Sequence, residues 1–140
     1  MKYSTVRMKI ETLHRDLGLD RIGEQARAEA WKKQKGRSYT TDYVLDETFT
    51  LLFRRLRIED AKKSVNAIEK GIERGYIRLE RITAERFEMA KSLRMRFQDK
   101  LRISFTDFTS MVVMTELGIA DILTEDEHFT QVGMGFQRVP

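Results

Sequence analysis

Two aspartates near the end of the chain flank segments that are expected to be buried. Asp107 opens a segment that is apolar nearly all round, and Asp126 follows the short apolar run 119–123. The apolar residues of the first segment are Phe108, Met111, Val112, Val113, Met114 and Leu117. A helix that is apolar on every side belongs in a core, and a short apolar run is typical of a parallel strand. A carboxylate beside such elements is costly unless it is paired or binds a metal, so both acids are candidates for a site.

The composition predicts one folded domain over residues 1–140. A chain of 140 residues is long enough to bury a core. Its 41% hydrophobic and 34% charged residues are typical of a globular protein rather than a disordered one. The net charge of +4, with a pI near 9.4, permits a polyanionic partner without requiring one. The absence of cysteine excludes disulfides and thiolate metal sites.

The sequence also predicts the cellular location of the protein. Its N-terminus lacks the apolar core of a signal peptide. No apolar run approaches the roughly 20 residues that cross a bilayer. We therefore expect a cytoplasmic protein without a membrane partner.

Strands and helices alternate along the predicted chain. Val6, Met8 and Ile10 alternate with basic residues, which predicts a strand ending near Glu11. Thr40 or Thr41 is expected to cap the helix that follows the second strand, and Gly118 to end the last helix. Further strands are expected at 37–40, 76–82, 119–123 and 136–139, and helices at 22–35, 42–56, 58–74, 83–97 and 107–117.

This alternation predicts a three-layer α/β/α sandwich with a mostly parallel central sheet of four or five strands. In such sheets the functional site lies beyond the carboxyl ends of the strands. Glu11 and Asp126 both follow predicted strands, and Asp107 lies at a helix N-terminus, where the macrodipole favours an anion by roughly 0.3–1 kcal/mol. The topology thus predicts that these three acids converge.

Two stretches resemble a known family. The C-terminal part of the chain resembles the C-terminal half of PIN domains, the small nucleases of VapC-type toxins. The resemblance lies in the segment SFTDFTSMVVMTELGIADILTEDEHF (104–129) and in the glycine-containing turn and last strand, ending at Pro140, that follow it. TTDYVLDETFTLL (40–52) resembles the PIN helix that supplies a metal-binding glutamate, and Glu47 is the matching residue. Helical geometry places Glu47 at the border of the apolar stripe and Asp46 about 100° away.

The resemblance implies four acidic ligands for a metal: Glu47, Asp107, Asp126 and Glu11. Glu11 departs from the family pattern, which has aspartate at this position. The additional methylene of glutamate would displace the metal, and misplacement by about 1 Å can cost on the order of a hundredfold in rate. Carboxylates without cysteine or a histidine cluster suit Mg²⁺ or Mn²⁺.

The implied function is a metal-dependent endoribonuclease that hydrolyses RNA phosphodiesters. RNA, a cognate antitoxin and a second copy of the chain in a homodimer are the implied partners. The alternative is a catalytically weak or inactive PIN-like module that binds RNA or a partner protein. Whether Glu11 points into the acid cluster would discriminate between the two.

Each candidate also has an ordinary structural role. Asp107 could serve only as a helix N-terminal charge, Asp126 as a turn residue and Glu47 as a surface carboxylate. Thr106 and Ser110 could cap the helix, or could orient Asp107 or hold a water. Packing or hydrogen bonding is the simpler interpretation of His128. A solvated face or phosphate contacts would explain the basic residues Arg54, Arg55, Arg57, Lys62, Lys63, Lys91, Arg94, Arg96, Lys100 and Arg102.

Overall fold

The computed structural model describes residues 4–6, 38–124 and 127–139. Five strands form one sheet in the order β3-β2-β1-β4-β5, and every neighbouring pair is parallel. The strands are β1 (Ser4–Val6), β2 (Ser38–Thr41), β3 (Ile77–Glu80), β4 (Asp121–Leu123) and β5 (Gln137–Val139). The predicted three-layer α/β/α fold with a parallel sheet is confirmed.

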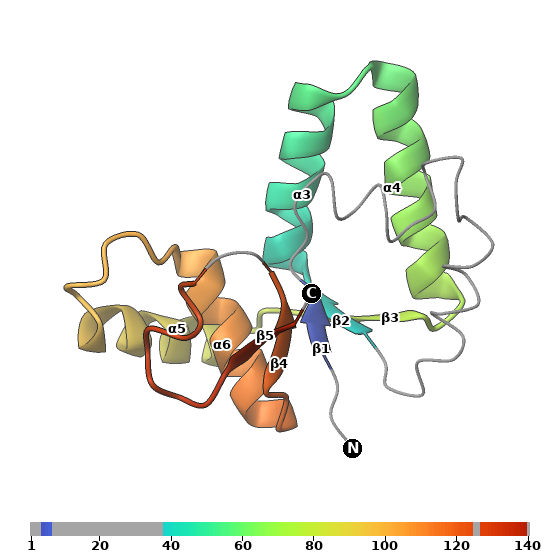
Figure 1. Cartoon of the computed structure of the whole chain (residues 1–140). Coiled ribbons are helices and arrows are strands. Elements are labelled where there is room, and N and C mark those ends of the chain that lie inside the picture. The colour runs from blue at the N-terminus through green and yellow to red at the C-terminus, as the bar shows by residue number, and fades with distance from the viewer. Residues whose placement is uncertain (1–3, 7–37, 125–126, 140) are drawn as a thin grey trace.

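Four helices of the described residues connect these strands. They are α3 (Asp42–Arg55), α4 (Ile58–Glu73), α5 (Ala84–Arg96) and α6 (Phe105–Leu117). Figure 1 shows α3 and α4 as a hairpin at one end of the molecule, while α5 and α6 pack together at the other. The predicted elements between residues 38 and 139 are therefore present, each within a few residues of its expected limits.

The central strand β1 lies between β2 and β4. Ser4 is in register with Ser38 on one side and with Asp121 on the other. The sequence predicted a strand that continues to Glu11, but residues 7–37 lie outside the described part of the chain. The helix expected at 22–35 lies there too.

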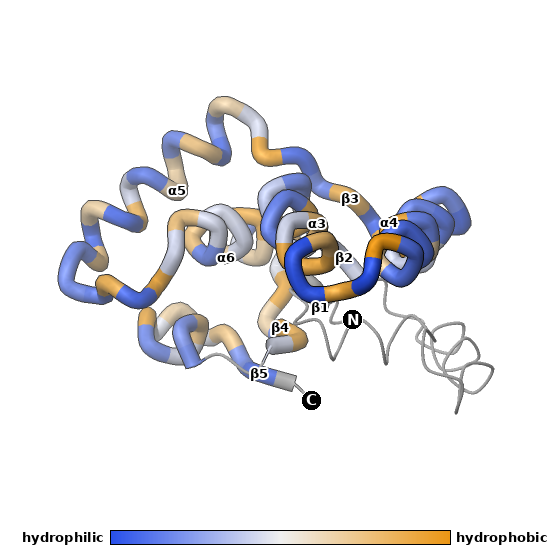
Figure 2. The backbone as a smooth tube through the Cα atoms, turned by 90° about the horizontal axis from the view of Figure 1, so that it is seen from above, coloured by the Kyte–Doolittle hydropathy of each residue, from blue (hydrophilic) through white to orange (hydrophobic). Residues whose placement is uncertain are grey.

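Helix α6 is the centre of the core. Phe108, Met111, Val113 and Met114 are all completely buried. Figure 2 shows α6 between α5 and β4, and it shows α4 as mostly hydrophilic. Gly118 ends α6 in the left-handed conformation with φ of 68°, as the sequence predicted.

Helix α3 begins directly at the carboxyl end of β2. Thr41 is its N-cap, because the Thr41 hydroxyl accepts a hydrogen bond from the Val44 amide at 3.1 Å. Asp42 is the first residue of this helix, and its Oδ1 accepts a hydrogen bond from the Ile82 amide at 2.9 Å. Asp42 thus joins the start of α3 to the segment that follows β3.

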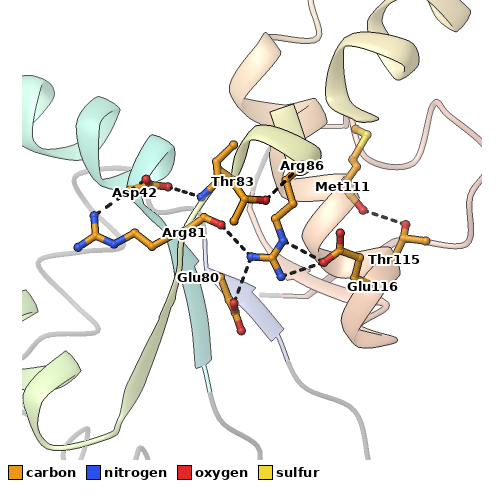
Figure 3. Close-up of polar contacts among 9 residues, drawn as sticks. Asp42, Glu80, Arg81, Thr83, Arg86, Met111, Thr115 and Glu116 are labelled. Atoms are coloured by element: carbon orange, nitrogen blue, oxygen red, sulfur yellow. Dashed lines mark hydrogen bonds and ion pairs between the residues drawn. The ribbon is translucent and has the colours of Figure 1, made fainter. Parts of the chain in front are cut away.

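Arg86 on α5 ties three elements together (Figure 3). Its Nε and Nη2 contact Oε2 of Glu116 on α6 at 2.9 and 2.8 Å. Its Nη1 contacts Oε2 of Glu80 on β3 at 3.2 Å and donates to the Arg81 carbonyl at 2.8 Å. Burial lowers the pKa of the Arg86 guanidinium, but hydrogen bonds to Glu116 and Glu80 outweigh that effect and raise it. The α5–α6 pair is thereby anchored to the edge of the sheet.

Candidate active site

Asp107 lies in the first turn of α6 and is completely buried. It forms a capping box with Ser104. The Ser104 hydroxyl accepts from the Asp107 amide, and the Ser104 amide donates to Asp107 Oδ2, both at 3.1 Å. Ser104 is therefore the N-cap, and of the roles left open for Thr106 and Ser110 capping is not the one observed. A serine three residues before an acid was the available signal.

His128 is the second partner of the same carboxylate oxygen. Its Nδ1 lies 3.1 Å from Asp107 Oδ2, although 21 residues separate the two in the sequence. The His128 side chain is 22% exposed, whereas that of Asp107 is fully enclosed. The contact brings the turn after β4 against the first turn of α6. Hydrogen bonding was the expected role of His128, but no sequence signal indicated Asp107 as its partner.

Ser110 lies one turn beyond Asp107 on α6 and is also completely buried. Within the described residues its Oγ has no hydrogen-bond partner. A buried hydroxyl without a partner costs about 1–3 kcal/mol. This end of α6 therefore has the capacity to bind a polar group that is not part of the described chain, such as a water.

Glu47 lies half-buried on α3, between the exposed Asp46 and the buried Thr48. This agrees with the predicted position at the border of the apolar stripe. Helix α3 also contacts α6, which carries Asp107. The two helices that bear Glu47 and Asp107 therefore pack against each other.

Two of the four predicted ligands, Glu11 and Asp126, lie outside the described residues. Among the residues that are described, no group of three or more acidic, histidine or cysteine side chains is arranged to hold a metal ion. The convergence of Glu47, Asp107, Asp126 and Glu11 therefore stays a prediction.

The basic residues singled out in the sequence differ in their surroundings. Arg54, Arg55 and Arg57 are exposed around the junction of α3 and α4. Arg94 instead donates to the carbonyls of Phe97, Lys100 and Ile103, and its guanidinium lies 4.7 Å from the ring centre of Phe108. Arg94 therefore has neither of the two predicted roles, solvation or phosphate contact, because its guanidinium binds the carbonyls of the loop between α5 and α6.

In the described part of the chain, every helix is too short or too polar to cross a membrane.

Comparisons with known proteins identify the family. The sequence model of the PIN domain matches residues 12–134. The crystal structure of VapC20 from Mycobacterium tuberculosis, described as a toxin that cleaves the sarcin–ricin loop, superposes with a TM-score of 0.66 at 27% sequence identity. The match covers 92% of this chain and 94% of VapC20. A search of curated proteins found no match. Because the family model spans most of the sequence, the chain belongs to the PIN domain family.

Proposed function

We propose that this chain is an endoribonuclease that depends on a divalent metal ion. The observation that carries the proposal is Asp107, a fully buried carboxylate at the start of α6. A carboxylate is rarely buried without a charge partner or a metal. The family model and the similarity to VapC20, itself described as an RNA-cleaving toxin, support the same function.

The donor set suits Mg²⁺ or Mn²⁺. Glu47, Asp107 and Asp126 would hold the ion, with Glu11 as a fourth ligand, and hard cations of this kind prefer oxygen ligands. A bound ion supplies an activated water for attack on the phosphodiester and a positive charge near the leaving oxygen.

The protein's own residues prepare this site. The Ser104 amide and His128 fix Asp107 Oδ2 from two sides, so the carboxylate loses little freedom when it binds an ion. The Ser110 hydroxyl is available for a water on the same helix. The buried wall of α6 excludes bulk solvent, which strengthens electrostatic interactions at the site.

RNA is the proposed substrate. The description of VapC20 names a structured loop of RNA as its target, and we propose structured RNA as the substrate class here. The exposed arginines at the α3–α4 junction, Arg54, Arg55 and Arg57, are the proposed phosphate contacts. Such contacts contribute affinity that weakens with salt and carries no sequence information.

The remaining expectations are part of this proposal. We propose a cognate antitoxin as a partner, which the similarity to a VapC toxin supports, and we further propose a homodimer and a cytoplasmic location. The alternative, an inactive PIN-like module that binds RNA or a protein, rests on the glutamate at position 11.

Cleavage of a structured RNA in the presence of Mn²⁺, with a chelator as the blank, tests the proposal. Asp107→Asn and Glu47→Gln should each lower the rate by on the order of a hundredfold, because each alters a ligand that fixes the ion. Asp46→Asn is the matched control, since Asp46 is exposed on the same helix beside Glu47, and it should cleave like the parent. No cleavage by the parent, or equal cleavage by all variants, would contradict the nuclease function.

A further inference from the structure

The hydrogen bond between His128 and Asp107 has a defined direction. An ionised carboxylate only accepts hydrogen bonds, so the imidazole must donate through Nδ1–H. The second ring nitrogen, Nε2, then carries no proton in the neutral side chain. The contact at 3.1 Å therefore assigns one of the two neutral tautomers.

Within the described part of the chain, two donors of different origin contact Asp107 Oδ2. The Ser104 amide belongs to the same helix start, whereas His128 comes from the turn that follows β4. A capping box alone leaves an aspartate some freedom to rotate about its side-chain bonds. The second donor, fixed by a different part of the fold, removes that freedom.

We propose that His128 is a positioning residue for Asp107, which it orients for binding a divalent ion. The inference rests on the proposed function. Donors of this kind, which contact a metal ligand rather than the metal, typically contribute 10–100-fold to metal affinity. Because Nδ1 lies 3.1 Å from Asp107 Oδ2, the role proposed for His128 is to orient that carboxylate, and the variants below test this role against ligation of the ion by Nε2.

Two amide replacements distinguish the two nitrogens of the ring. In His128→Asn the side-chain amide nitrogen can take the place of the donor Nδ1–H, whereas in His128→Gln the amide oxygen can take the place of the unprotonated Nε2. His128→Ala removes both. We therefore expect His128→Ala and His128→Gln to weaken Mn²⁺ binding by about 10–100-fold, and His128→Asn to bind within about threefold of the parent.

The experiment measures the Mn²⁺ dissociation constant by calorimetry at pH 8, and RNA cleavage at saturating Mn²⁺. A melting curve without metal separates loss of fold from loss of orientation. Rescue by Asn alone supports the proposal. Rescue by Gln alone would assign Nε2 as a ligand and overturn it. If all three variants bind Mn²⁺ like the parent, the contact is purely structural and the proposal is refuted. If all three bind Mn²⁺ equally weakly, positioning through Nδ1 is refuted as well.

A second measurement does not depend on the ion. The ¹⁵N shifts of the His128 ring at pH 8 should report the Nδ1–H tautomer, and Asp107→Ala should abolish that preference. An Nε2–H tautomer in the parent would refute the inference. If the parent cleaves RNA and binds Mn²⁺ but the His128 variants behave normally, only this inference fails. If the parent neither binds Mn²⁺ nor cleaves RNA, the proposed function fails as well.

Discussion

Arg86→Met removes a partly buried cation while keeping most of the packing volume of the side chain. The Arg86 side chain is only 14% exposed, and its partners Glu80 and Glu116 are 26% and 35% exposed. Fully exposed ion pairs contribute about 0–1 kcal/mol, whereas hydrogen bonds to charged groups contribute about 1.5–3 kcal/mol. These half-enclosed pairs lie between the two cases.

The magnitude follows from three acceptors. We assign about 1 kcal/mol each to Glu116, Glu80 and the Arg81 carbonyl, so Arg86→Met should lower the free energy of unfolding by about 3 kcal/mol. For a chain of this size that corresponds to a fall in melting temperature of roughly 10 °C. Arg86→Lys should lose less than Arg86→Met, because lysine keeps the charge but lacks the planar fork that meets several acceptors.

Urea unfolding followed by circular dichroism measures these differences, with Arg102→Met as the control. Arg102 is exposed, so its loss should change stability by no more than about 0.5 kcal/mol. A double-mutant cycle with Glu116→Gln should give a coupling energy of about 1 kcal/mol. The raised pKa of Arg86 means that its contribution persists below the alkaline range in which arginine titrates, so the effect of Arg86→Met should not change between pH 6 and 9. A melting temperature within about 2 °C of the parent would refute the reasoning.

Three further predictions concern the helix end and the metal site. Gly118→Ala should cost about 1–2 kcal/mol, because φ of 68° strains any residue with a Cβ although the space around Gly118 is open; a melting curve equal to the parent's would contradict this. Mn²⁺ at about 100 times its dissociation constant should stabilise the parent by about 2.7 kcal/mol, but not Asp107→Asn; an unchanged parent melting curve would favour the inactive-module alternative. Glu11→Asp should raise turnover without changing RNA affinity; if it leaves cleavage unchanged while Asp107→Asn abolishes it, Glu11 is not a ligand.

Local patterns in the sequence predicted the elements that pack around α6. A helix that is apolar on nearly all sides is expected to be buried in the core. The glycine at its end adopts a left-handed conformation that other residues avoid. The sequence left the cap open because several hydroxyl residues stand together at this helix start. Only the backbone geometry distinguishes Ser104 from Thr106 there.

Contacts between distant residues could not be predicted in this way. Arg86 and Glu116 are 30 residues apart, and Asp107 and His128 are 21 apart. Both pairs form because strands and helices fold back on one another, and periodicity carries no information about such distances. Among these residues, the sequence singled out Asp107 for its burial and its family match, whereas the residues that hold it in place were found only in the structure.

A crystal structure with Mn²⁺ tests the central claim most directly. Anomalous scattering should show one or two ions held by Glu47, Asp107 and Asp126, with His128 Nδ1 still on Oδ2 of Asp107. An ion bound elsewhere, or any of the three acids on a different face of the sheet, would contradict a carboxylate-held metal site in this protein.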